Sequence, residues 1–125
     1  MYELDIRRIQ FSNEADVMLK MLKARTGITP NILCRMALCL SLDEPGIPRP
    51  VLGEKSTREI NRFTLLGEYD LAFMSLVKVR LDQDQIAPAD AELAFVNHVH
   101  RGIALLANRM KSLVDLSGLV VGTEK

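Results

Sequence analysis

The sequence has no excess of charge of either sign. Its 125 residues carry 16 Lys and Arg against 16 Asp and Glu, so the formal net charge is zero. Proteins that bind a polyanion usually carry surplus cations, so the total charge does not by itself indicate a nucleic-acid partner. The distribution is less even, because residues 1–42 hold six basic and four acidic side chains. The small positive excess therefore lies toward the N-terminus.

Cysteines and long apolar runs are also scarce. Cys34 and Cys39 have a spacing that suits neither a zinc site nor a redox pair, so we expect two buried free thiols. No apolar segment reaches the roughly 18 residues that span a bilayer, and charges interrupt the N-terminus where a secretory signal would begin. The sequence predicts a soluble protein of the reducing cytoplasm, with no membrane association.

The hydrophobic content, 48%, is enough to form one core at this length, so we expect residues 1–125 to be a single, mainly α-helical domain. Within it, residues 1–42 predict a strand and two helices, and the prolines and glycines of 43–67 predict a long surface loop. Residues 68–116 predict a pair of helices, and 117–125 a fraying tail.

A short strand is predicted in "LDIRRIQFS". Ile9 and Phe11 lie on one face of it, and Ile6, Arg8 and Gln10 lie on the other. The strand therefore offers an apolar face to the core and keeps a largely polar face outside.

Two helices follow the strand. Ser12 or Asn13 caps the first, which ends at Gly27. Thr29 and Pro30 begin the second, which runs to about Leu42. The inward residues of the first helix are Ala15, Met18, Leu19 and Leu22, and those of the second are Leu33, Met36, Ala37 and Leu40.

The C-terminal half predicts two further helices. The helix from about Glu68 to Asp82 is so apolar that we expect it to be central or to face another protomer; its apolar residues are Leu71, Ala72, Phe73, Leu76, Val77 and Val79. The last helix runs from about Ala89 to Leu116, with Leu93, Val96, Ile103, Leu106, Ala107, Met110 and Leu113 as its apolar residues.

Strand, helix, glycine turn and helix are the order of a ribbon-helix-helix unit, in which two chains pair their strands in the DNA major groove. This interpretation demands an assembly that presents Arg8 and Gln10 from two strands together. The free N–H groups near Thr29 and Asn31 would then hold a DNA phosphate. A Thr-Pro helix start is also common wherever two helices meet, so a purely structural turn remains the alternative.

The side chains predicted to contact DNA are Arg8, Gln10, Lys20, Lys23, Arg25, Thr29 and Asn31. Each of these cations has an ordinary solvated charge as its alternative role. For Arg35, a structural salt bridge to an acid such as Glu68 competes with phosphate binding. Arg62 and Arg101 are assigned to the scaffold, where guanidinium groups would tie the long loop to the helical body.

Catalytic signals are weak. Glu68 and Asp70 could hold Mg²⁺, but residues two apart on a helix point about 200° from each other. The same geometry separates His98 and His100, which we interpret as structural. There is no glycine-rich phosphate loop, nucleophile elbow or C-x-x-C motif. We therefore predict no catalytic residue, no metal and no cofactor, and an enzymatic role is the less favoured interpretation.

Three separated runs, "LKARTGITPNILCRMALCLSL", "NRFTLLGEYD" and "HVHRGIALL", resemble in order the DndE family of DNA sulfur modification, or phosphorothioation. The resemblance extends from about Ile6 to Leu116. It implies a helical homo-oligomer, a tetramer, that binds double-stranded DNA, with nicked duplex preferred in the family. It also implies partners that perform the sulfur chemistry: a cysteine desulfurase, a sulfurtransferase-like subunit with an iron–sulfur cluster, and an ATPase.

Three hypotheses remain open. The favoured one is a non-catalytic DNA-binding and scaffolding subunit of the phosphorothioation machinery. The second is a ribbon-helix-helix transcription regulator, which residues 6–42 alone would support. The third is a metal-dependent DNA-nicking enzyme, which depends on Glu68 and Asp70.

Overall fold

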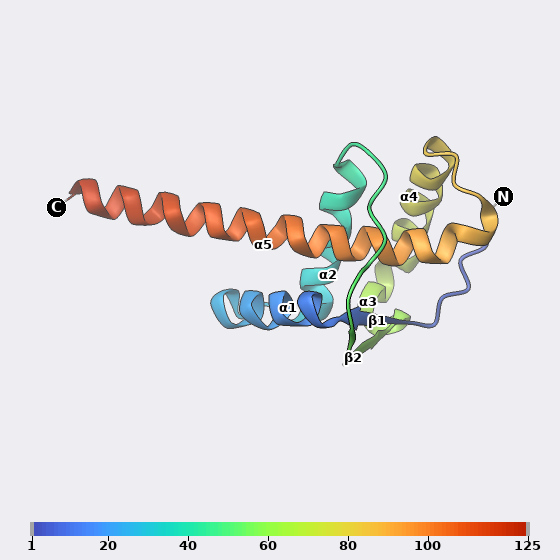
Figure 1. The fold of residues 1–125 in the computed structure, drawn as a ribbon, viewed down its shortest axis with the longest axis horizontal. Helices are drawn as coiled ribbons and strands as arrows, with labels where there is room; N and C mark the ends of the chain where they lie inside the picture. Colours follow the sequence, from blue (N-terminus) through green and yellow to red (C-terminus); the bar gives the residue numbers. More distant parts are fainter. Residues whose placement is uncertain (1, 125) are drawn as a thin grey trace.

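The computed structural model describes the backbone of residues 2–124 and the side chains of residues 2–111. The chain is mainly helical, with one small antiparallel sheet (Figure 1). The elements are β1 (Arg8–Ser12), α1 (Asn13–Thr26), α2 (Pro30–Asp43), β2 (Lys55–Asn61), α3 (Arg62–Leu66), the 3₁₀ turn Gly67–Tyr69, α4 (Asp70–Gln83), the 3₁₀ turn Pro88–Asp90 and α5 (Ala91–Glu124).

The predicted order of strand, helix, turn and helix is confirmed at the N-terminus. The Ser12 hydroxyl accepts a hydrogen bond from the Ala15 N–H at 3.1 Å, which begins α1 as an N-cap. Gly27 ends α1 with a φ of 75°, a left-handed conformation that glycine adopts without a steric penalty. Helix α2 begins at Pro30 as expected. Thr29 is the residue before it, but its side chain makes no capping hydrogen bond.

Residues 55–61, which we predicted to be part of a loop, form strand β2 instead. β2 pairs antiparallel with β1, with Ile9 opposite Ile60 on the buried side and Gln10 opposite Glu59 on the outer side. β1 therefore has a partner strand within its own chain, and the joint presentation of Arg8 and Gln10 by two chains stays a prediction. The sequence "KSTREIN" conceals this strand because Ile60 is its only large apolar residue.

Helix α4 has two different faces. Met74, Val77 and Leu81 are buried, whereas Leu71 and Leu76 are exposed by 80% and 56%. The predicted helix is confirmed, although it begins at Asp70, after α3 and a 3₁₀ turn. Only one side of α4 therefore packs into the core, and apolar side chains on the other side are exposed.

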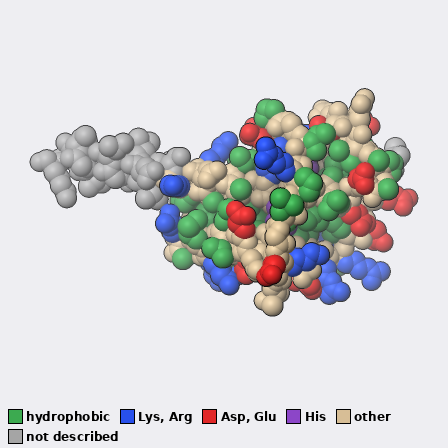
Figure 2. Space-filling model, in the orientation of Figure 1, with side chains coloured by type: hydrophobic (Ala, Val, Ile, Leu, Met, Phe, Trp, Pro, Cys, Tyr) green, Lys and Arg blue, Asp and Glu red, His purple; other side chains and the backbone are tan. Residues whose placement is uncertain are grey.

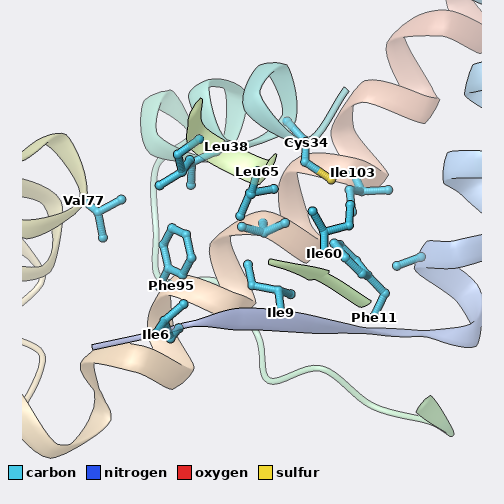
Figure 3. Packing of buried hydrophobic residues seen from close by; sticks show 14 of the residues in the cluster. Ile6, Ile9, Phe11, Cys34, Leu38, Ile60, Leu65, Val77, Phe95 and Ile103 are labelled. Carbon is cyan, nitrogen blue, oxygen red and sulfur yellow. The ribbon is translucent and has the colours of Figure 1, made fainter. Parts of the chain in front are cut away.

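Helix α5 lies across the molecule, with α1 alongside it and α2 crossing it (Figure 1). It extends beyond the predicted end at Leu116, to Glu124, and the side chains of the predicted tail, 117–125, lie outside the described residues. The core forms where the sheet, α2, α3, α4 and α5 meet. Figure 3 shows this packing, to which the following residues contribute: Ile9, Phe11, Leu38, Ile60, Leu65, Val77, Phe95 and Ile103.

Two inward assignments within α2 are wrong. Met36 is 41% exposed, and Cys39 is exposed as well, whereas Leu33, Cys34 and Ala37 are buried. Burial raises the pKa of the Cys34 thiol to about 12, although the charge of Arg58 acts in the opposite direction, so Cys34 behaves as a small hydrophobic side chain. The outward placement of Met36 and Cys39 follows from the position of α5, which covers the other side of α2.

The contact between α2 and α5 depends on a glycine. A Cβ atom on Gly102 would lie 1.8 Å from the carbonyl oxygen of Ala37, so only glycine permits this approach. Because the Cβ atom would clash with backbone atoms of Ala37, no rotamer change could relieve the clash. It sets how closely the two helices pack.

We expect Gly102→Ala to lower the free energy of unfolding by about 3 kcal/mol or more, because α2 and α5 must separate. Helix propensity alone predicts that Gly102→Ala raises the free energy of unfolding, by about 1 kcal/mol. Urea denaturation measures the difference. Ala24→Gly, at an exposed position of α1, is the control for the propensity effect. An equal or more stable Gly102→Ala variant would contradict the close contact.

Candidate nucleic-acid interface

Several arginines are used inside the structure. Arg62 donates to both carboxylate oxygens of Asp70, at 2.7 and 2.8 Å, and to the Leu4 carbonyl at 2.7 Å. Arg101 donates to the Ser41 hydroxyl at 2.9 Å and to the Gly46 carbonyl at 2.8 Å. The assignment of Arg62 and Arg101 to the scaffold is confirmed, since both tie loops to the helical body.

Arg35 is also structural, but its predicted partner is wrong. Its Nε donates to the carbonyl of Leu65 at 2.7 Å, and its guanidinium lies 5.9 Å from the centre of the Tyr69 ring. No ion pair with Glu68 is present among the described side chains. Arg35 therefore caps the C-terminal end of α3, where unpaired carbonyl groups favour a cation.

The two histidines occupy separate structural positions, as predicted. His98 is buried and shares a 2.8 Å hydrogen bond between its Nδ1 and the Ser41 hydroxyl, which in turn accepts from Arg101. Burial, and then the charges of Arg101 and Arg80, lower the pKa of His98 to about 4, so the ring is neutral at physiological pH. His100 accepts from the Ser12 N–H at 3.2 Å and packs on Phe11.

The acidic pair Glu68 and Asp70 is not arranged as a metal site. The Arg62 fork occupies both oxygens of Asp70, and the hydrogen bond from Arg62 lowers the pKa of that carboxyl group. Within residues 2–111, no group of three or more His, Cys, Asp or Glu side chains is placed to hold a metal ion.

On the strand, the predicted DNA-contacting residues Arg8 and Gln10 are exposed on the outer face of the sheet. Arg8 forms an ion pair of 3.1 Å with Glu59 of the neighbouring strand, and Gln10 makes a long hydrogen bond of 3.5 Å to the Ser56 carbonyl. Glu59 partly neutralises this face, which weakens its attraction for a phosphate.

The predicted DNA-contacting residues of α1 differ in whether they form an ion pair. Lys20 forms an ion pair of 3.4 Å with Asp16, which Arg58 also binds. Lys23 and Arg25, in the last turn of α1, are exposed and make no ion pair with any described side chain. These two cations are therefore available to an external anion.

Thr29 and Asn31 lie directly after this end of α1, at the start of α2. The Thr29 hydroxyl donates to the Asn31 Oδ1 at 2.5 Å, so the two side chains bind each other rather than capping the helix. Pro30 has no N–H, and the backbone N–H groups of Asn31 and Ile32 belong to the first turn, where an α-helix leaves donors unpaired. The turn thus combines unpaired cations with free backbone donors.

The structure separates the predicted residues into two groups. Arg8 and Gln10 lie on the sheet, while Lys23, Arg25 and the α2 start lie at the far end of α1, a helix of 14 residues and therefore about 20 Å long. Figure 2 shows Lys and Arg side chains at the left end of the body, and both acidic and basic side chains at the right end.

One surface was not identified as a site from the sequence. An apolar groove of about 470 Å³ lies between α2 and the start of α4, lined by Ile32, Arg35, Met36, Cys39, Tyr69, Ala72, Phe73 and Leu76. The high apolarity of α4 was its only signal in the sequence. In the part of the chain that the structure describes, no helix is both long enough and apolar enough to cross a membrane.

These features define a small helical protein, built on a two-stranded ribbon, whose structural arginines face inward while a second set of cations faces solvent. Residues 8–113 match the family model of DndE, the DNA sulphur modification protein. The chain belongs to the DndE family.

Solved structures agree with this assignment. The chain is similar to DndE from Escherichia coli B7A, involved in DNA phosphorothioation modification, with 31% identity and a TM-score of 0.64 over 85% of this chain and 98% of the other. It is also similar to a mutant DndE involved in DNA phosphorothioation, with 29% identity and a TM-score of 0.62 over 82% and 97%. Among curated proteins, none matches the sequence.

The buried neutral His98 predicts a pH dependence of stability. Its pKa is near 6.5 in the unfolded chain and about 4 in the folded one, so the unfolded state binds more protons between these values. We expect full stability above pH 6.5 and a loss of roughly 3 kcal/mol as the pH falls to 4. Denaturation over a pH series measures this slope, which should decrease in His98→Asn. A slope that is unchanged in this variant would contradict the assignment.

Proposed function

We propose that the chain is a DNA-binding and scaffolding subunit of the DNA phosphorothioation machinery, which acts as a homo-oligomer, in the form of a tetramer. In this role it binds duplex DNA, including nicked duplex. The sulfur chemistry belongs to partner subunits: the cysteine desulfurase, the sulfurtransferase-like subunit and the ATPase.

The observation that carries this proposal is the pair of unpaired cations at the end of α1. Lys23 and Arg25 are exposed beside the first turn of α2, where Asn31 contributes a free N–H. A phosphate can receive both charge and backbone hydrogen bonds there, a combination typical of anion sites at helix starts. Such contacts fix a protein on the DNA backbone without selecting a base sequence.

Self-association is proposed to use the α2–α4 face. Its exposed apolar side chains include Met36, Tyr69, Leu71, Leu76 and Val79. Contiguous apolar surface of this kind commonly marks a protein interface. A second protomer would bury the groove. The oligomer would then present the cations of several protomers to one DNA duplex, which raises the affinity of a chain that has no net charge.

The two alternative functions have less support. A ribbon-helix-helix regulator presents paired β1 strands from two chains, whereas β1 is paired here with β2 of the same chain. A nicking enzyme based on Glu68 and Asp70 requires a carboxylate that Arg62 already binds with both its oxygens. We therefore propose neither of them.

We expect Lys23→Ala combined with Arg25→Ala to reduce duplex affinity roughly tenfold at 0.1 M salt, and to lower the salt slope of log K by about two, because two phosphate contacts are lost. Fluorescence anisotropy over a salt series measures both quantities. The control is Arg49→Ala with Lys78→Ala, which removes two other exposed cations that make no ion pair with a described side chain. Equal losses in both variants would show an effect of total charge and contradict this site.

The assembly face can be tested separately. We expect Leu76→Asp to convert the oligomer to monomers in light scattering, since a buried carboxylate without a partner is costly. Leu93→Asp is the matched control, because Leu93 is 58% exposed and Leu76 is 56% exposed. An oligomer that persists in Leu76→Asp, with unchanged mass, would place the interface elsewhere.

A further inference from the structure

Two long stretches of this electrically neutral chain contain no acidic residue. There is no Asp or Glu between Asp16 and Asp43, nor between Glu92 and Asp115. The first stretch covers most of α1 and all of α2 except its last residue, and the second covers most of the described part of α5. These three helices pack together (Figure 1). Along each of the two stretches, the cations have no acidic residue as a sequence neighbour.

Several acidic side chains lie toward the other end of α5. Asp82 is in the last turn of α4, Asp84 follows that helix, Asp90 ends the 3₁₀ turn before α5, and Glu92 is in the first turn of α5. Figure 2 shows blue side chains at the left end of the body and red ones at the right end, with further blue side chains at the lower right. A polyanion responds to the local field, so the cations at the left end can attract it although the net charge is zero.

Within the acid-free part of α5, Arg109 and Lys111 are exposed. Neither makes a hydrogen bond or an ion pair with a side chain in residues 2–111. They lie on the two flanks of the helix stripe that Leu106, Ala107 and Met110 turn toward the core. Both side chains are therefore exposed on α5 without an acidic partner among the described residues.

Other arginines of the helical body are bound inside the structure. Arg80 donates to the carbonyls of Leu42 and Gly46, and Arg101 donates to those of Ser41 and Gly46. Those guanidinium groups hold the loop after α2. Arg109 has no comparable partner, so the described fold gives it no structural role.

The end of α1 and this part of α5 lie at the same end of the body. In Figure 1 the light blue end of α1 lies alongside the orange-red part of α5, and the two helices run side by side. Lys23 and Arg25 on α1 are thus on the same end of the molecule as Arg109 and Lys111 on α5. Unpaired cations that lie together raise the local positive potential more than the same charges apart.

We propose that Arg109 and Lys111 join Lys23 and Arg25 in one cationic surface, formed by α1 and α5, that binds the phosphate backbone of duplex DNA. This inference rests on the proposed function and adds a second helix to its binding site. Contacts of Lys and Arg to phosphate oxygens carry no sequence information, so we expect the contribution of this surface to be independent of sequence. The neutral total charge conceals it because acidic residues in other parts of the chain offset its cations.

The test compares three variants with the wild-type chain: Arg109→Ala with Lys111→Ala, Lys23→Ala with Arg25→Ala, and the control Arg49→Ala with Lys78→Ala. Each removes two positive charges. Anisotropy is measured over a salt series with two duplexes of unrelated sequence, and circular dichroism verifies folding. We expect the Arg109/Lys111 variant to lose roughly tenfold in affinity at 0.1 M salt and about two units of salt slope on both duplexes, with a much smaller loss in the control.

The outcomes separate the two proposals. If the wild-type chain and the Arg109/Lys111 variant bind with the same slope, while the Lys23/Arg25 variant is weakened, α5 does not belong to the surface and the proposed function stands. If the control loses as much as the Arg109/Lys111 variant, the effect follows total charge and this inference is wrong. If the wild-type chain binds neither duplex, the proposed function fails and this inference fails with it.

Discussion

The close approach of α2 to α5 at Gly102 is the contact on which the rest of the fold depends. Because Gly102 has no side chain, the backbone of Ala37 can lie directly on α5. That approach brings Ser41 of α2 within hydrogen-bonding distance of His98 and Arg101 of α5. Arg101 then holds the loop that leaves α2. The loop leads into β2, so the position of the ribbon follows from the same helix contact.

The arginines of this protein fall into two populations with different physical roles. Those that face inward bind carbonyls and carboxylates, as Arg62 does with Asp70 and Leu4. A buried guanidinium group costs free energy unless each of its donors has an acceptor. These arginines therefore favour the one fold in which all their acceptors are in place. Among the arginines without an ion pair to a described side chain, Arg25 and Arg109 lie on α1 and α5, in stretches of sequence without acidic residues. This division, rather than the net charge, determines where an anion can bind.

Much of the fold could be predicted from the sequence, and the errors share a physical origin. Ser12 and Gly27 mark the ends of α1 by local backbone chemistry, so they were found directly. β2 was missed because Ser56 and Arg58 occupy inward positions where an apolar residue would have revealed the strand. Met36 was assigned inward because helical periodicity identifies an apolar stripe but not which part of it a neighbour covers. Lys23, Arg25, Thr29 and Asn31 were named as interface residues, but Arg109 and Lys111 were not, and the division into paired and free cations was not predicted.

The sequence by itself determined β1 and the long helices, the absence of net charge and the family, since caps, periodicity and motif order depend on neighbours along the chain. Tertiary structure alone decided that β1 finds its partner in β2, that Asp70 binds Arg62 and that Arg8 is paired with Glu59. It also decided which face of α4 remains uncovered. These outcomes depend on contacts between residues far apart in sequence, where the available partner is set by how the helices pack and not by any local pattern.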